Sequence, residues 1–225
     1  MHSVELLPDP VTERAVREAW RRLADAGLPS LAGHRHPTNR PHLTLASADA
    51  LPAEVRARLL GALAEALPVP LRLDGFVRFS GRVRVLAWAV RPDDALLRLH
   101  GAVWRILREA PGSGRPNPLL DPARWVPHVT LGRGRDASWD VPADEVFSTG
   151  GGTPGGGGSG GGAGARRDDS VTRPGGGGGG APRGAGRAAV VSARPPPTPA
   201  GVVTGAWTAA RSYDSVTRTV EGLAP

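Results

Sequence analysis

The sequence predicts an α+β domain made of two pseudo-equivalent halves. Three segments with apolar residues at helical spacing alternate with short runs of strand-like character. One order of elements occurs twice: an amphipathic helix, a loop containing Gly and Pro, and a pentapeptide of the form Pro-His-x-Thr-Leu, where x is apolar. The two pentapeptides occupy 41–45 and 127–131, and their histidines are 86 residues apart. We therefore expect each half to supply one strand to a shared groove.

The first half has well-marked boundaries. Its expected elements are a strand, a helix, a loop, the motif strand and a second helix, at 3–7, 11–26, 28–40, 41–46 and 52–66. Asp9 and Pro10 suit the cap and the first turn of the first helix, and Gly27 suits its end. Trp20 belongs to the apolar stripe of that helix, so we expect it in the core.

The second half contains a predicted antiparallel hairpin that turns at Ser80 and Gly81. Its expected elements are two strands, a helix, a loop and the motif strand, at 69–79, 82–91, 93–109, 110–125 and 126–131. His100, within the helix, is interpreted as a partly buried structural histidine. A short strand or helix is expected at 141–148. Residues 202–213 are interpreted as the last strand of the same domain, with a disordered tail as the alternative.

A low-complexity segment separates these last two elements. Residues 150–187 contain 19 of the 32 glycines of the chain, and such a segment cannot bury enough apolar surface to offset its ordering entropy. We therefore divide the chain into a folded domain at 1–149, a Gly/Pro/Arg-rich disordered insertion at 150–200, and a final strand with a tail at 201–225. A folded domain tolerates a long surface insertion because the entropy of loop closure grows slowly with length.

The positive charge is unevenly distributed. The formal net charge is +7, and residues 150–200 carry 6 Arg against 2 acidic residues. A basic flexible segment attracts polyanions. A solvated linker is the preferred interpretation of this composition, and a tether for a polyanion is the alternative.

The composition excludes several classes of protein. The chain has no cysteine, which excludes a disulfide framework and thiolate chemistry and is compatible with a reducing cytoplasm. No secretory signal and no apolar run of membrane-spanning length is visible, so we expect a cytoplasmic protein with no membrane partner. His34 and His36 have no nearby Cys or carboxylate, so we expect them at the surface or at the rim of the groove, and we expect no metal cofactor.

The repeated pentapeptide carries the chemistry. Side chains alternate between the two faces of a strand, so His42 and Thr44 share one face, and so do His128 and Thr130. Two histidines can hold opposite protonation states at one pH and act as general base and general acid. The two hydroxyls can donate hydrogen bonds to the nonbridging oxygens of a phosphate. These groups suit the hydrolysis of a cyclic phosphodiester, and the sequence leaves open which histidine is the base.

Two arginines beside the motifs are candidates for further phosphate contacts. Arg40 and Arg133 can each add a charge-assisted hydrogen bond. Arg40 is two residues from His42, an even separation, whereas Arg133 is five residues from His128, an odd separation. Strand alternation therefore places only Arg40 on the histidine face. We expect the two halves to contribute unequally to phosphate binding.

The paired motif resembles the signature of the two-histidine phosphoesterase superfamily, which includes 2'-5' RNA ligase-like proteins and RNA 2',3'-cyclic phosphodiesterases. The resemblance covers residues 1–135 and extends to 202–213, and the glycine-rich block departs from it. It implies a bilobal α+β fold in which antiparallel sheets surround a central groove, with helices outside. It also implies that His42 and His128 are catalytic, that Thr44 and Thr130 bind phosphate, and that no metal is required.

Three functional hypotheses follow. The first is metal-independent hydrolysis of 2',3'-cyclic phosphodiesters on RNA ends or nucleotides by a monomeric enzyme, with 2'-5' RNA ligation as the possible reverse reaction. The second is a non-catalytic RNA- or nucleotide-binding module that uses the same groove; two intact His-x-Thr units disfavour it. The third makes the basic segment at 150–200 an RNA tether.

Overall fold

The computed structural model describes residues 1–139, Phe147 and residues 202–225. The insertion expected at 150–200 lies outside the described residues, and so does the element expected at 141–148, apart from Phe147. The described residues belong to a single compact unit of the chain.

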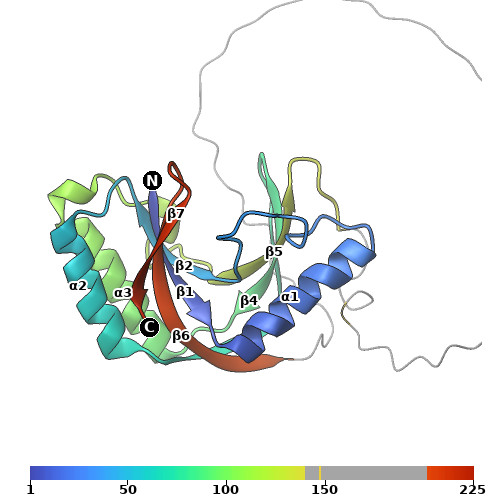
Figure 1. Ribbon diagram of the computed structural model, residues 1–225, viewed down its shortest axis with the longest axis horizontal. Helices are drawn as coiled ribbons and strands as arrows, with labels where there is room; N and C mark the ends of the chain where they lie inside the picture. The colour runs from blue at the N-terminus through green and yellow to red at the C-terminus, as the bar shows by residue number, and fades with distance from the viewer. Residues whose placement is uncertain (140–146, 148–201) are drawn as a thin grey trace, which may run out of the picture. The chain divides into compact units, whose positions relative to one another are not determined.

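Seven antiparallel strands form one continuous sheet (Figure 1). In chain order they are β1 (His2–Pro8), β2 (Leu43–Ala48), β3 (Val69–Phe79), β4 (Arg84–Val90), β5 (His128–Gly134), β6 (Val203–Asp214) and β7 (Thr219–Ala224). The spatial order is β2-β1-β6-β3-β4-β5, and β7 pairs with β6 off this path. The α+β class is confirmed. The strands expected to form separate sheets are joined into one.

The two motif strands, β2 and β5, are the two ends of this path. They are not hydrogen-bonded to each other, yet they are in contact because the sheet curls strongly (Figure 1). The sheet reads outward from its centre as β6-β1-β2 on one side and β3-β4-β5 on the other. This symmetry of position brings the repeated motifs together from opposite ends of the sheet.

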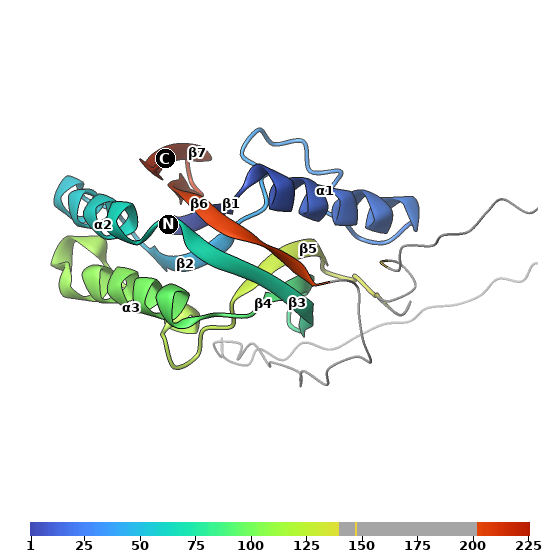
Figure 2. The same ribbon diagram turned by 90° about the horizontal axis from the view of Figure 1, so that it is seen from below.

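Three helices, α1 (Pro10–Asp25), α2 (Ala53–Ala66) and α3 (Asp94–Glu109), cover the sheet. Helix α1 packs against β1, β5 and β6, whereas α3 packs against β2 and β3. Helices α2 and α3 lie side by side, as Figure 2 shows. Each motif strand is thus supported by one long amphipathic helix. Within the described residues, no helix is both long and apolar enough to span a membrane.

Asp9 joins the start of α1 to β6. Its carboxylate accepts hydrogen bonds from the backbone N–H groups of Val11 and Thr12, as an N-cap does, and from the N–H of Ala206 in β6 at 2.8 Å. Burial alone would raise the pKa of Asp9, but these bonds lower it to about 2. A side chain at Gly205 would collide with Asp9 and Thr12, so glycine is required for this close approach.

Strand β6 occupies the middle of the sheet, between β1 and β3. The sequence predicts a strand at 202–213, but the expectation that it is the last strand is wrong, because β7 follows and pairs with β6. Most of β7 is exposed, with only Leu223 buried. Such a strand lacks the apolar alternation that marks a strand in a sequence, and pairing with β6 defines it instead.

The motif strand expected at 41–46 begins later than expected. Strand β2 starts at Leu43, so Pro41 and His42 precede the hydrogen-bonded ladder, whereas β5 starts at His128 itself. The hairpin of β3 and β4 is confirmed. The helix boundaries differ from the expected ones by at most one residue, and the second and third helices end at the expected residues. Trp20 lies in the core with only 2% of its surface exposed, as expected.

Candidate active site

The two motif histidines have the same local geometry. Nδ1 of His42 lies 2.7 Å from the carbonyl oxygen of Arg40, and Nδ1 of His128 lies 2.7 Å from the carbonyl oxygen of Val126. A carbonyl oxygen only accepts, so each Nδ1–H is the donor and the tautomer is fixed. In both rings Nε2 is therefore the nitrogen left to exchange a proton with a bound group.

His128 lies in an apolar environment. Its ring packs on Phe79 of β3, with 4.6 Å between ring centroids. Burial lowers the pKa of His128, the positive charge of His42 lowers it further, and the bond to the Val126 carbonyl opposes both. His42 immediately precedes β2 and His128 begins β5, and these two strands are in contact.

His42 lies beside a buried carboxylate. Oε1 of Glu5, in β1, is 3.8 Å from Nε2 of His42, and Glu5 is only 3% exposed. The other oxygen of Glu5 accepts a hydrogen bond of 2.8 Å from Nε of Arg211 in β6, which is also buried. Ser3 donates to Oε1 of Glu5 at 2.7 Å. We call Ser3, Glu5 and Arg211 the charged wall.

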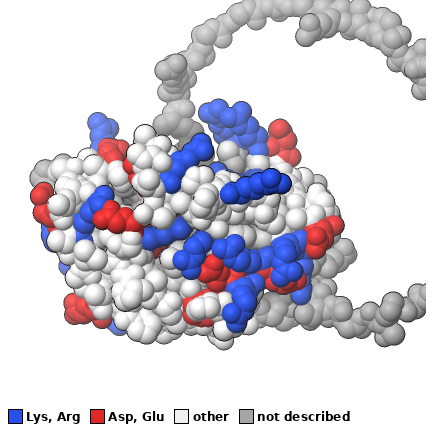
Figure 3. Space-filling model, in the orientation of Figure 1, with Lys and Arg blue, Asp and Glu red and all other residues white. Residues whose placement is uncertain are grey.

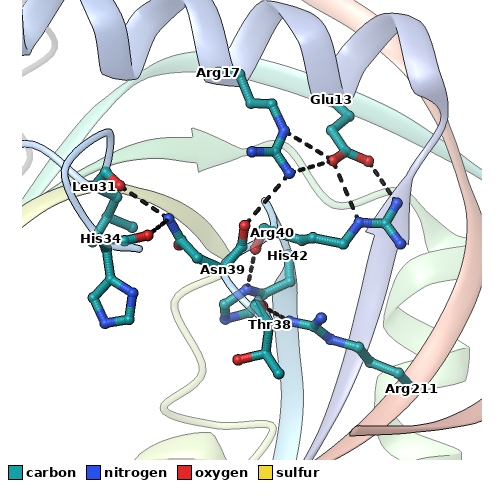
Figure 4. Close-up of polar contacts among 9 residues, drawn as sticks. All are labelled: Glu13, Arg17, Leu31, His34, Thr38, Asn39, Arg40, His42 and Arg211. Carbon is teal, nitrogen blue, oxygen red and sulfur yellow. Dashed lines mark hydrogen bonds and ion pairs between the residues drawn. The ribbon is translucent and has the colours of Figure 1, made fainter. Parts of the chain in front are cut away.

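Arg211 also fixes the loop that leads into the first motif. Its second nitrogen donates to the carbonyl oxygen of Thr38 at 3.0 Å (Figure 4). One guanidinium thus holds both Glu5 and the segment four residues before His42. A buried cation and anion that satisfy each other in this way position groups more than they stabilise the fold.

Each motif threonine is followed by a β-bulge. In β2, Glu5 pairs with Thr44 and Val4 with Ala46, so Leu45 has no partner. In β5, Thr130 and Gly132 pair with successive residues of β4, so Leu131 has no partner. Both leucines are fully buried. The bulge is therefore part of the repeated motif, and it bends each strand at the threonine.

The bulge corrects the expectation for Arg133. Strict alternation puts Arg133 on the face opposite His128, but the extra residue of the bulge shifts the register. Arg133 pairs with Val85 and Thr130 pairs with Ala87. Val85 and Ala87 are two residues apart on β4, so they share one face. Cross-strand partners point to the same face. Arg133 consequently shares the face of Thr130 and has no partner among the described residues.

Arg40 does not face the histidines freely. Its guanidinium binds Glu13 of α1 at 2.6 Å, and Arg17 binds the same carboxylate at 2.8 Å (Figure 4). Burial raises the pKa of Glu13, but the two arginines more than offset this and lower it. Glu13 thus partly neutralises Arg40 and holds it against α1, which weakens its case as a phosphate ligand relative to Arg133.

Two tryptophans hold the backbone of the motif threonines. Nε1 of Trp20, in α1, donates to the carbonyl oxygen of Thr130 at 3.0 Å. Nε1 of Trp125, in the loop before β5, donates to the carbonyl oxygen of Thr44 at 3.1 Å. Trp125 is itself stacked on His100 of α3, with 3.8 Å between centroids. Since β2 and β5 end the sheet path, these indoles satisfy carbonyl groups that no neighbouring strand reaches.

The loop before each motif is hydrogen-bonded to the motif strand of the other half. Leu31, in the loop before the first motif, donates its backbone N–H to Leu131 of β5 at 3.0 Å. Asn117, in the loop before the second motif, donates to Ser47 of β2 at 2.9 Å. Each loop therefore braces the motif strand of the other half, which couples the positions of the two histidines.

The described part of the chain contains no group of three His, Asp, Glu or Cys side chains able to hold a metal. His34 and His36 are tilted neighbours, with 6.4 Å between ring centroids, and Nδ1 of His36 is engaged by Thr38. His100, expected to be structural, is buried within α3 and contacts the carbonyl oxygen of Leu120 at 3.1 Å. Burial lowers the pKa of His100.

Sequence reasoning did not single out Glu5, Arg211 or Phe79. A weak signal existed for Glu5 and Phe79 but not for Arg211. Ser3 and Glu5 are polar positions within a mostly apolar strand, and Phe79 ends an alternating run. Their proximity to the histidines depends on the pairing of β1 with β6 and of β3 with β4, which no local pattern specifies.

The family comparison agrees with the motif. The model of the 2'-5' RNA ligase superfamily matches residues 8–148, and the chain belongs to that superfamily of two-histidine phosphoesterases. Usb1 of Kluyveromyces marxianus is 16% identical, with a TM-score of 0.39 over 60% of this chain and 71% of that chain. Its structure with uridine monophosphate is 17% identical, with the same TM-score, over 60% of this chain and 72% of that chain. A comparison with curated proteins gave no match.

Proposed function

We propose that this protein hydrolyses 2',3'-cyclic phosphodiesters on RNA ends or nucleotides without a metal ion. The observation that carries the proposal is the shared geometry of the two histidines: each donates Nδ1–H to the carbonyl two residues earlier, which leaves Nε2 free in both rings, and the two rings stand at the starts of two contacting strands, β2 and β5. A matched pair of this kind suits proton transfer at two oxygens of one phosphate.

In the proposed mechanism His128 is the base and His42 the acid. Burial and the charge of His42 lower the pKa of His128, so it is neutral near pH 7 and its Nε2 can accept a proton. Glu5 lies near enough to pair with His42 in its protonated form. Environments that separate two like groups in this way are how one site supplies both an acid and a base.

The reaction then proceeds by in-line attack. Nε2 of His128 takes a proton from water as the water oxygen bonds to phosphorus. The bond from phosphorus to one ribose oxygen breaks, and Nε2–H of His42 gives its proton to that oxygen. The hydroxyls of Thr44 and Thr130, with Arg133, donate hydrogen bonds to the nonbridging oxygens as charge gathers on them. The product is a phosphate monoester. Ligation uses the same site with the 5'-hydroxyl of a second RNA in place of water, so that its oxygen bonds to phosphorus, one ribose oxygen leaves with the proton of the acid, and a diester forms.

Single histidine variants test the proposal. With a 2',3'-cyclic mononucleotide and excess chelator, His42→Ala and His128→Ala should each lower kcat by about 10²- to 10⁴-fold. Thr44→Ala and Thr130→Ala should lower it by roughly tenfold or more. His2→Ala is a matched control, since alternation puts His2 on the face of β1 opposite Glu5, and it should leave kcat unchanged.

The outcomes separate the alternatives. Activity retained in either motif variant, or lost on adding chelator, would contradict the proposal. Tight nucleotide binding without turnover in the unaltered protein would favour the binding module instead. Loss of RNA affinity on deleting residues 150–200, with a reduced salt dependence, would support the tether.

A further inference from the structure

A pocket of about 400 Å³ lies between α1 and the loop at 28–40, beside the first motif. We call it the basic pocket. Its lining contains no carboxylate, and its polar members are three arginines, two histidines and an amide, namely Arg17, Arg21, Arg35, His34, His36 and Asn39. Figure 3 shows arginine side chains gathered over this side of the molecule, with acidic ones interleaved.

Several donors in the basic pocket are already oriented. Nδ1 of His36 accepts from the hydroxyl and the backbone N–H of Thr38, at 2.7 and 3.3 Å, so Nε2 carries the proton and is the donor left for a ligand. The amide nitrogen of Asn39 donates to the carbonyl oxygens of Leu31 and His34, both at 3.0 Å, which braces the loop (Figure 4). A braced loop loses less entropy when it binds.

The cations of the basic pocket differ in how strongly they are engaged. Arg17 pairs with Glu13 and lies over the ring of Trp20, 5.7 Å from its centroid. Arg21 pairs with Glu18 on the exposed face of α1. Arg35 is exposed and has no partner among the described residues. Arg35 is therefore the charge most available to an anion, and Arg21 comes next, because its side chain is 66% exposed against 43% for Arg17.

The second half of the molecule provides an internal comparison. A pocket of about 240 Å³ lies between α3 and the loop before the second motif, with Trp104 in the place that Trp20 has in the first. Its polar lining is Arg108, Arg124 and the carboxylate of Asp121, and two prolines fill the loop side. The repeated fold thus explains why each half has a pocket between helix and loop. It does not explain why the lining of the basic pocket contains arginines and no carboxylate.

The basic pocket is physically connected to the histidines. Asn39 lines the pocket and is three residues before His42, so an extended chain separates their Cα atoms by at most about 11 Å. Thr38, next to Asn39, is held by Arg211, which also holds Glu5 beneath His42. A nucleic acid strand whose terminal phosphate lies at the histidines can therefore extend toward the basic pocket.

We infer that the basic pocket binds the phosphodiester group of the nucleotide that flanks the terminal cyclic phosphate, which makes single-stranded RNA a better substrate than a mononucleotide. This inference rests on the proposed function for the identity of the terminal group. The pocket supplies charge and N–H donors and no acceptor carboxylate, which suits a phosphate oxygen and disfavours a cation.

The test compares two substrates in two matched double variants. Arg21→Ala/Arg35→Ala should lower the ratio of kcat/KM for a cyclic-phosphate-ended tetranucleotide to that for a cyclic mononucleotide by about tenfold. Arg108→Ala/Arg124→Ala removes the same charge from the pocket of the second half and should leave the ratio unchanged. An unchanged ratio in the first variant, or equal falls in both, would overturn the inference.

A binding measurement keeps this result separate from the proposed function. Fluorescence anisotropy with a single-stranded RNA that lacks a cyclic phosphate requires no turnover. In Arg21→Ala/Arg35→Ala, the slope of log affinity against log salt should become shallower by about 0.7 for each phosphate that the protein no longer neutralises. If the unaltered protein fails to hydrolyse cyclic phosphates but this slope still changes, the proposed function fails and the RNA site remains. If the slope does not change, the basic pocket is not an RNA site.

Discussion

The two walls beside the histidines occupy matched positions and have opposite chemistry. In the first half, Thr44 of β2 pairs across strands with Glu5 of β1, and Glu5 pairs with Arg211 of β6. In the second half, Ala87 lies opposite Thr130, and Val77 lies opposite Ala87. We call Val77, Phe79 and Ala87 the apolar wall. A repeated motif thus presents two histidines of the same tautomer to two different environments, and the difference can separate their protonation states.

Removing one partner of the charged wall should have the largest effect on stability. Arg211→Met leaves the buried carboxylate of Glu5 without its cation, which costs about 3–5 kcal/mol in free energy of unfolding. Urea denaturation measures this loss. The double variant Glu5→Gln/Arg211→Met should recover much of it, and an equal loss in the double variant would show that the pair is not coupled.

Opening the apolar wall should remove part of the asymmetry between the histidines. Phe79→Ala admits water to the ring of His128, and because burial is the main cause of the depression, the pKa of His128 should rise toward its ordinary value. An NMR titration of the imidazole signals measures it. Phe76→Ala, on the other face of β3, is the control and should leave the pKa of His128 unchanged.

The indole donors test whether the two halves are positioned equally. Trp20→Phe and Trp125→Phe keep a ring in place but remove the N–H bond to a motif threonine, which is worth about 1 kcal/mol. If the bond positions the threonine, kcat should fall by up to roughly tenfold with KM little changed. A loss of stability with unchanged kcat would reduce both tryptophans to core residues.

The smallest expected effect is on the pH dependence of stability. Burial lowers the pKa of both His128 and His100 in the folded protein, so the unfolded chain binds more protons and stability falls as the pH drops from about 7 through the folded pKa values. Each unit of depression corresponds to about 1.4 kcal/mol. Denaturation at several pH values should show this slope, and His100→Asn should flatten it; a slope unchanged by that variant would contradict the assignment.

Much of the fold could be predicted from local pattern. The helical stripes, the hairpin at Ser80 and Gly81, and the repeat of helix, loop and motif all depend on nearest-neighbour chemistry, and the structure has each of them. Strand β7 could not be predicted, because exposed residues held only by pairing carry no periodic signal.

The site was less predictable than the fold. Parity arguments assume an unbroken ladder, and the bulge after Thr130 invalidated the one for Arg133. Strand alternation also could not indicate the ion pair between Arg40 and Glu13, because Glu13 lies on α1 and reaches Arg40 only through the packing of that helix. The charged wall required β6, which pairs with β1 across about two hundred residues of chain, so sequence neighbours could not reveal it.

The pH dependence of kcat/KM for a 2',3'-cyclic nucleotide tests the central claim most directly. A neutral base and a protonated acid predict a bell-shaped profile. Its ascending limb should lie below pH 6.5, the ordinary value for histidine, because the pKa of His128 is lowered, and that limb should disappear in His128→Ala. A profile with its ascending limb above pH 6.5, or one that His128→Ala leaves unchanged, would contradict the assignment of His128 as the base.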